Sequence, residues 1–288
     1  MSFLAPRLAH FHKNASPVDA VGVGVDDLES TEAKELFREY FLPIRSWTVR
    51  SPFCRAALLR LGVAEERIRV GADWAWLYSV KQNLVGWAEA FWRRCGVDPR
   101  RSLLVINPVN LIWRDQVATK ANIATALDKI VRSLGMQIAF FCNECRDGAD
   151  YDYVAALEIQ QAMREPAIIV PNEYYSPDEA ITLLMSATVT VAQRYHFAIQ
   201  SVLAGGIPVS IVRGQKMEGL VRELGLPTAG TIESVDSDLF VNAVACAVRD
   251  RATLIPRLQT ERHRMNERAK RNLDMIKSVA PYAQLFSS

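Results

Sequence analysis

Short apolar segments alternate with helix-like segments along most of the chain, and this alternation restricts the fold more than any other feature. The segments that we interpret as strands are residues 18–25, 44–50, 67–70, 102–109, 137–142, 167–170, 188–192 and 208–212. Most are followed by a segment whose apolar residues recur at helical spacing. Strand–helix alternation of this kind is typical of an α/β protein with a mostly parallel sheet.

The alternation is interrupted once and then restarts, which predicts two domains. The interruption is the sequence GVDPRR at residues 96–101, a Gly- and Pro-containing linker candidate. We therefore expect an N-terminal half over residues 1–95 and a second half over residues 102–257. A C-terminal helix over residues 258–288 is expected to contact both halves. A length of 288 residues fits one large domain or two ordinary ones.

Composition and charge exclude several classes of protein. The net charge of +2 gives no electrostatic argument for binding nucleic acid. No apolar run approaches the roughly 20 residues needed to span a bilayer, and the first residues lack the apolar core of a secretory signal. We therefore expect a soluble, cytoplasmic protein.

The C-terminal segment has an apolar stripe at helical spacing and a basic opposite face. The basic residues of that face are Arg257, Arg262, Arg264, Arg268, Lys270 and Arg271. A solvated amphipathic face explains them most simply. The alternative is contact with an anionic polymer or with the inner face of the membrane. We expect a break in this helical segment at Pro256.

The five cysteines are odd in number and scattered, which argues against a disulfide framework. Cys142 and Cys145 form a lone CxxC pair without a second pair at metal-binding spacing. We interpret them as incidental thiols at the end of a strand, with redox or zinc chemistry as the alternative, and we expect no metal site.

Two helix starts are indicated by capping residues. The sequence SPDE, which begins at Ser176, combines an N-cap residue, a first-turn proline and acidic residues. A helix over residues 236–248 has Asp236 or Ser237 available as its cap.

Cationic side chains follow two consecutive strands in residues 188–226. Arg194 and His196 follow the first strand, and a loop with Lys216 follows the second. Ligands of open α/β sheets collect at the carboxyl ends of strands, so this arrangement suits an anion. If extended geometry persists through Tyr195, Arg194 and His196 point to the same side and Tyr195 points into packing. The alternatives are a surface arginine, a hydrogen-bonded or helix-capping histidine and a solvated lysine.

Several sequence blocks, in this order, resemble the polysaccharide pyruvyl transferase family. They are WTVRSPFCRAALLRLGV, ADWAW, SPDEAITLLMSATVTVAQRYHFAIQSVLAGGIPVSIV and GQKMEGLVRELGLP, and they fall within residues 18–228. The most specific part is Arg-x-His at a strand end, then Gly-x-Pro, then a lysine. The resemblance implies a GT-B-like fold, in which two Rossmann-like halves face a cleft and a C-terminal helix crosses back.

The sequence departs from the family pattern in its first half. Members usually open with an additional βα portion that carries a Gly-Asn-x-Gly-Asp type loop, so the resemblance predicts a first domain shortened at its N-terminus. The family's Arg-Asp is Arg50-Ser51 here. Both departures fall on the half expected to hold the acceptor, so donor binding is better supported than complete activity.

The resemblance implies transfer of a pyruvate ketal from phosphoenolpyruvate to two hydroxyls of a sugar. The acceptor would be a polysaccharide precursor or a lipid-linked oligosaccharide, and no cofactor is expected beyond phosphoenolpyruvate as co-substrate. Arg194 and His196 would bind the donor and act catalytically, with His196 as acid or base. Lys216 would hold phosphate, and Arg114 would be a second clamp. Candidates for the acceptor side are Arg50, Asp73 and Asp152, of which Asp152 could instead cap a helix.

Two other functions fit the same residues. A GT-B glycosyltransferase would place these cations on the diphosphate of a nucleotide sugar. A non-catalytic, truncated relative would bind a sugar or a partner protein. The sequence specifies neither the sugar, nor its hydroxyls, nor the oligomeric state.

Overall fold

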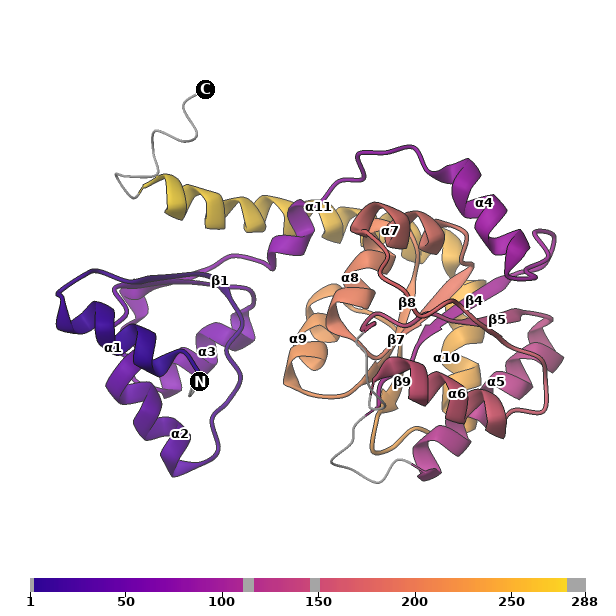
Figure 1. The fold of residues 1–288 in the computed structure, drawn as a ribbon, viewed down its shortest axis with the longest axis horizontal. Coiled ribbons are helices and arrows are strands. Elements are labelled where there is room, and N and C mark those ends of the chain that lie inside the picture. Colours follow the sequence, from indigo (N-terminus) through magenta and orange to yellow (C-terminus); the bar gives the residue numbers. More distant parts are fainter. Residues whose placement is uncertain (1–2, 111–116, 146–150, 279–288) are drawn as a thin grey trace. The chain divides into compact units, whose positions relative to one another are not determined.

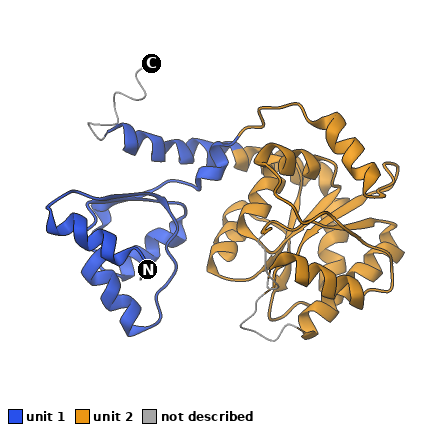
Figure 2. Cartoon of the chain, in the orientation of Figure 1, with its two compact units in different colours: residues 1–78, 263–288 blue, residues 79–262 orange. Residues whose placement is uncertain are grey.

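The computed structural model describes residues 3–110, 117–145 and 151–278. The chain divides into two compact units, which Figure 2 shows in separate colours. Unit 1 comprises residues 1–78 and 263–288, and unit 2 comprises residues 79–262. Each unit contains its own parallel sheet, so the predicted α/β class is confirmed.

Unit 1 is built on a three-stranded parallel sheet in the order β1-β2-β3. Its elements up to residue 78 are α1 (Ala5–Lys13), β1 (Asp19–Val23), α2 (Thr31–Leu36), η1 (Phe37–Phe41), β2 (Ser46–Val49), α3 (Pro52–Arg60), η2 (Glu65–Arg67), β3 (Ile68–Val70) and η3 (Trp74–Leu77). The core is aromatic: the rings of Phe37 and Trp47 stack with centroids 6.0 Å apart.

Unit 2 is built on a six-stranded sheet in the order β6-β5-β4-β7-β8-β9. Its elements are α4 (Val85–Arg94), β4 (Leu103–Asn107), α5 (Val117–Leu134), β5 (Gln137–Phe140), α6 (Asp152–Ala162), β6 (Ile168–Ile169), α7 (Pro177–Met185), β7 (Val189–Ala192), α8 (Tyr195–Leu203), β8 (Pro208–Val212), α9 (Gln215–Leu224), β9 (Thr228–Thr231), α10 (Ser237–Arg249) and the first part of α11 (Arg251–Lys277). All strand pairs are parallel. This is the strand order of the doubly wound dinucleotide-binding folds.

Helices cover both faces of the larger sheet (Figure 1). Helices α5, α6 and α10 pack together, whereas α7 packs against α4 and α8, and α8 packs against α9. The central strands β4 and β7 are therefore buried along their whole length. Strands that are buried on both faces read as continuous apolar runs, which is why the sequence predicted them well.

The two predicted helix starts are confirmed. Ser176 and Glu179 form a reciprocal capping box at the start of α7, with Pro177 as the first helical residue. Asp236 caps α10 by accepting the backbone N–H groups of Asp238 and Leu239, each at 2.9 Å.

Three elements and one helix break differ from the sequence prediction. Helix α1 and strand β9 were not predicted, and the expected loop around Lys216 is helix α9. The break expected at Pro256 is wrong, because α11 runs through that residue. Pro256 lies in the second turn of α11, where its missing N–H costs the helix one hydrogen bond near its start without ending it. The chain breaks instead at Asp250, which ends α10.

The boundary between the units lies after Tyr78 and not at residues 96–101. Helix α4, expected in the N-terminal half, belongs to unit 2 because it packs on α7. The indole N–H of buried Trp92 donates to the carbonyl of Leu183 at 3.1 Å and fixes this contact. An aromatic helix next to a linker gives no sequence signal for the side on which it packs.

Helix α11 contributes to both units, since the division falls after Arg262. Within unit 1, Asn266 donates to the carbonyl of Trp76 and buried Asn272 to that of Ala72, each at 2.9 Å. The basic face also has internal partners. Its side chains that donate to backbone carbonyls are Arg257 (to Gly225), Arg262 (to Leu203), Arg268 (to Gly71) and Arg271 (to Val70).

Most of the basic face of α11 thus binds the ends of neighbouring elements. Leu203 and Gly225 lie at the C-terminal ends of α8 and α9, where carbonyl groups lack helical partners and attract cations. Within the described part of the chain, no helix has the length and apolar composition required to cross a bilayer.

We predict that Asn272→Ala destabilises the attachment of α11 to unit 1. The substitution leaves the buried carbonyl of Ala72 without its donor, which costs about 1–3 kcal/mol. Hydrogen exchange of the α11 backbone amides measures the loss. The control is Lys270→Ala on the same helix, which removes only an exposed pair with Glu267 and is expected to cost less than about 0.5 kcal/mol. Equal protection in the two variants would contradict the role of Asn272.

Candidate functional site

The candidate site lies at the carboxyl ends of β4 and β7, where the chain changes direction through the sheet. From β4 the chain proceeds outward to β5 and β6, returns to β7 on the other side of β4, and continues to β8 and β9. The last residues of the two central strands, Asn107 and Ala192, are paired in register. Ligands of open α/β sheets bind in the crevice at such a switch point.

A buried carboxylate organises this edge of the sheet. The side chain of Asp152, in the first turn of α6, is 0% exposed. It accepts hydrogen bonds from the side-chain amide of Asn107 at 3.2 Å and from the backbone N–H groups of Asn143 and Glu144 at 3.0 and 3.1 Å. One side chain thereby joins the segments that follow β4 and β5.

Arg194 completes the ion pair from the third segment, which follows β7. Its Nε lies 2.9 and 2.8 Å from the two carboxylate oxygens of Asp152, and its Nη2 lies 2.5 Å from Oδ1. Nη2 also pairs with Glu144 at 2.6 Å, and the arginine side chain is 18% exposed. Burial lowers the pKa of Arg194, but the hydrogen bond and charge of Asp152, with the charge of Glu144, raise it above the usual value.

Asp152 was predicted to orient a ligand or to cap a helix. It lies in unit 2 beside Arg194, and the N-cap residue of α6 is Tyr151. Ligand binding by Arg194 stays a prediction. The guanidinium of Arg194 already pairs with the carboxylate of Asp152.

A second buried side chain ties the segment after β4 to the segment after β7. Gln193, which is 1% exposed, accepts the backbone N–H of Val109 through Oε1 at 2.9 Å. The buried Nε2 of Gln193 and Oδ1 of Asn107 have no hydrogen-bond partner within the described residues. The two central strand ends are therefore fixed by side chains as well as by the sheet.

Extended geometry stops at Arg194, which differs from the expectation for the following residues. Tyr195 is the first residue of α8, so Tyr195 and His196 are helical. The helix places His196 at the exposed surface, with the two rings 5.4 Å apart in an edge-on arrangement. Tyr195 is only half-buried. His196 does not cap α8, whose N-cap residue Arg194 makes no side-chain capping bond.

The N-termini of α8 and α9 lie at the ends of adjacent strands, β7 and β8. Neither helix has a side-chain cap, and the N-terminus of a helix carries a partial positive charge that favours an anion. Lys216 is exposed in the first turn of α9, and Arg213 directly follows β8. Burial and the neighbouring cation Arg194 lower the pKa of Arg213. Several positive groups therefore gather at this edge.

Arg213 and Glu144 were not predicted as site residues. Arg213 follows strand β8 as Arg194 follows β7, so the rule that selected Arg194 would also have selected it. Glu144 lies inside the CxxC sequence, a pattern that signals its two thiols and not the residues between them. Arg114, the predicted second clamp, lies outside the described residues.

Two other candidates, Arg50 and Asp73, lie together in unit 1. Arg50 Nη1 lies 3.4 Å from Asp73 Oδ2, and both side chains are nearly buried. The other oxygen of Asp73 accepts the backbone N–H of Ala75 at 3.0 Å and caps η3. Gly24 allows this arrangement, because an added Cβ would lie 2.3 Å from the guanidinium carbon of Arg50.

Cys142 and Cys145 of the CxxC sequence are free thiols, the first buried and the second partly buried. Burial, reinforced by the charge of Asp152, raises the pKa of Cys142 to about 12. Burial likewise raises the pKa of Cys145, whose Sγ donates to the carbonyl of Glu173 at 2.9 Å. A raised pKa leaves little of a thiol in its thiolate form. Because the thiolate is the nucleophile, such thiols react slowly.

Comparison with known proteins identifies the fold. No protein-family model matches the sequence, and no curated protein matches it either. Many solved structures match the fold, at low sequence identity.

Three of the matching structures illustrate the similarity. The UDP-GlcNAc 2-epimerase of Neisseria meningitidis bound to UDP-GlcNAc is 7% identical, with a TM-score of 0.66 over 93% of this chain and 71% of that one. Anabaena HepE in complex with UDP-glucose is 12% identical, with a TM-score of 0.65 over 96% and 76%. A glycosyltransferase of Rickettsia africae is 11% identical, with a TM-score of 0.63 over 98% and 80%. The chain therefore has the α/β fold of the GT-B glycosyltransferases and nucleotide-sugar epimerases.

We predict that Asp152→Asn lowers the free energy of unfolding by about 3 kcal/mol, because it leaves a largely buried arginine with a weakened partner. Urea unfolding measures the loss. The control is Glu158→Gln on the same helix, which removes a partly exposed pair with Lys120 and should cost less than about 1 kcal/mol. An Asp152→Asn protein with unchanged stability would show that the pair is not structural.

Proposed function

We propose that the protein is a sugar-modifying transferase of the GT-B type that binds a phosphorylated donor at the carboxyl ends of β7 and β8. The observation that carries the proposal is the gathering of positive groups there. Lys216 and Arg213 adjoin the uncapped N-terminus of α9, and His196 lies in the first turn of α8.

Electrostatics explains why this edge favours an anion. The N-terminus of a helix carries a partial positive charge, so nearby cations are unfavourable there and anions are stabilised. Lys216 lies at that end of α9, and Arg213 precedes the helix. A bound phosphate would offset both charges and accept the first backbone N–H groups of the helix. Arg194 adds no net positive charge, since its two carboxylate partners, Asp152 and Glu144, together outweigh its single charge.

A nucleotide sugar is the first candidate for the donor. Solved structures with this fold include proteins in complex with UDP, UDP-glucose and UDP-GlcNAc. A diphosphate has two anionic groups, which suit the two neighbouring helix N-termini of α8 and α9. The sugar would then be transferred to a hydroxyl of an acceptor sugar.

Phosphoenolpyruvate is the second candidate, favoured by the order Arg194, His196, Gly-x-Pro and Lys216 in the sequence. In that reaction one sugar hydroxyl adds to the enol carbon while the methylene carbon takes a proton. A second hydroxyl then displaces phosphate from the same carbon, which leaves a cyclic ketal. His196, exposed in the first turn of α8, would be the acid or base, and Lys216 would hold the phosphate as it leaves.

A binding panel separates the two donors and tests the site. UDP-glucose, UDP-GlcNAc, UDP and phosphoenolpyruvate are titrated calorimetrically against the full chain, and we expect one donor class to bind. Lys216→Met or Arg213→Gln should weaken that binding by about 5- to 150-fold, which corresponds to about 1–3 kcal/mol for a lost charge-assisted hydrogen bond.

The matched control is Arg222→Met on the same helix. Arg222 is exposed near the C-terminal end of α9, where it pairs with Glu218. Its replacement changes the net charge equally and should leave donor affinity unchanged. If no compound of the panel binds, or if the three variants lose equal affinity, the proposed donor site is wrong.

We predict that His196→Gln retains donor binding and lowers turnover by about 10²- to 10⁴-fold, the usual contribution of general acid–base catalysis. Turnover is measured as the release of phosphate or UDP with a sugar acceptor present. Thermal unfolding of the same variant is the control, since exposed His196 contributes little packing. A destabilised variant with full activity per folded molecule would assign His196 to structure alone.

A further inference from the structure

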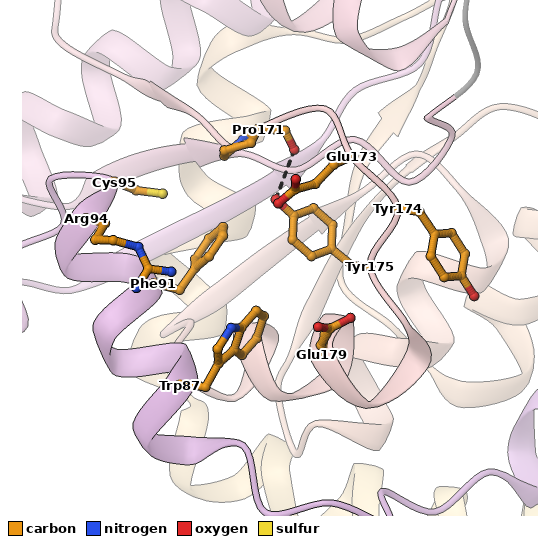
Figure 3. A pocket seen from close by; sticks show the side chains of 9 residues that line it. All are labelled: Trp87, Phe91, Arg94, Cys95, Pro171, Glu173, Tyr174, Tyr175 and Glu179. Carbon is orange, nitrogen blue, oxygen red and sulfur yellow. Dashed lines mark hydrogen bonds between the residues drawn. The ribbon is translucent and has the colours of Figure 1, made fainter.

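A separate pocket of about 370 Å³ lies within unit 2, between helix α4 and the segment that leads from β6 into α7 (Figure 3). Its volume falls within the usual range for small-molecule sites. The pocket is not the candidate donor site, because β6 is the edge strand of the sheet, whereas the donor edge is formed by β7 and β8.

Aromatic side chains form one wall of the pocket. Trp87 and Phe91 lie one turn apart on α4, with ring centroids 5.5 Å apart, and Tyr175 meets the ring of Phe91 edge-on at 5.7 Å. The hydroxyl of Tyr175 donates to the carbonyl of Pro171 at 3.0 Å, which fixes the orientation of its ring (Figure 3). Tyr174 is 81% exposed at the rim.

This wall is held rigidly from behind. Trp92, whose ring meets that of Phe91 edge-on, is buried and hydrogen-bonded to Leu183 of α7. Trp87 is only half-buried, so a large aromatic surface stays accessible. Because α4 is already packed against α7, a ligand that contacts Trp87 would pay little entropy for ordering this wall of the pocket.

Planar charged groups line the rest of the pocket. Glu179 projects from α7 toward the space between Trp87 and Tyr174, and its Oε2 is held by the backbone N–H of Ser176 at 2.7 Å (Figure 3). Burial raises the pKa of Tyr175, and the charge of Glu173, which lies beside its hydroxyl, raises it further. Arg94 contributes a guanidinium group, whose carbon lies 6.0 Å from the centre of the Phe91 ring.

We propose that this pocket is a binding subsite for a neutral sugar ring of an oligosaccharide. The electron-rich face of an aromatic ring attracts polarised C–H groups, such as those on the apolar face of a pyranose. Carboxylate and guanidinium groups are planar, so each can bind two adjacent hydroxyls at the edge of the same ring. The pocket combines these two kinds of wall.

A cationic ligand is the competing interpretation, because aromatic rings with carboxylates also bind quaternary ammonium groups. Arg94 argues against it, since this residue already brings a cation to the wall next to Phe91. A neutral polyol uses hydrogen-bond donors and acceptors alike, so it can contact Arg94, Glu173 and Glu179 together. The inference does not depend on the identity of the donor bound elsewhere.

The test is binding of neutral oligosaccharides built from glucose, galactose, mannose and N-acetylhexosamines, measured by saturation-transfer NMR and titration on the full chain. We expect at least one to bind. Trp87→Ala and Tyr174→Ala should each weaken that binding by about two- to tenfold, the worth of one aromatic contact. Tyr174 is so exposed that its replacement leaves the fold intact.

The matched control is Tyr153→Ala, an exposed tyrosine on α6 outside the pocket, which should leave saccharide affinity unchanged. The proposal is overturned if no saccharide binds, if the control weakens binding equally, or if choline binds in the pocket and the saccharides do not. Donor titrations on Trp87→Ala keep the two sites separate. Retained donor binding with lost saccharide binding supports the subsite, and the reverse pattern contradicts it.

Discussion

The carboxyl edge of the larger sheet depends on one buried charge, the carboxylate of Asp152. Three segments that are remote in sequence converge on it: Asn107 after β4, the backbone at Asn143 and Glu144 after β5, and Arg194 after β7. A carboxylate without water must be fully hydrogen-bonded and paired, because an uncompensated buried charge costs several kcal/mol. The requirement to satisfy Asp152 therefore fixes the positions of all three segments.

Because Arg194 is used to pair with buried Asp152, an anionic ligand at this edge depends mainly on other positive groups. Arg194 follows the central strand β7, yet the two negative charges of Asp152 and Glu144 outweigh its single positive charge. The positive character of the edge comes instead from the uncapped starts of α8 and α9, from Arg213 and from Lys216. Helix N-termini and flexible cations can recognise phosphate without a dedicated side-chain cage, and this is the basis of the proposed donor site.

The central strands β4 and β7 were predictable because buried parallel strands are continuous apolar runs, whereas the largely exposed β9 was missed. The starts of α7 and α10 were predictable for a different reason, because their capping residues are local in the sequence. Helix α9 was missed, since it begins after Gly214 without a capping side chain. The partner of Arg194 was not predictable, because Asp152 lies 42 positions away and only the folded sheet brings them together. The unit that α4 joins depends likewise on the tertiary contact of Trp92.

The two carboxylate partners of Arg194 differ in a way that reconciles its structural contact with its predicted role in ligand binding. Asp152 is 0% exposed and is held by three further donors, so removing it from Arg194 would strand a buried charge. Glu144 is 22% exposed, and water can solvate its carboxylate when the contact with Arg194 opens. An anionic ligand that reaches Nη2 of Arg194 therefore competes with Glu144 and leaves the contact with Asp152 in place. If the proposed donor reaches Arg194, the guanidinium would keep its contacts with Asp152 through Nε and Nη2, and the donor would replace only Glu144 at Nη2, which exchanges one anion for another at little cost in burial.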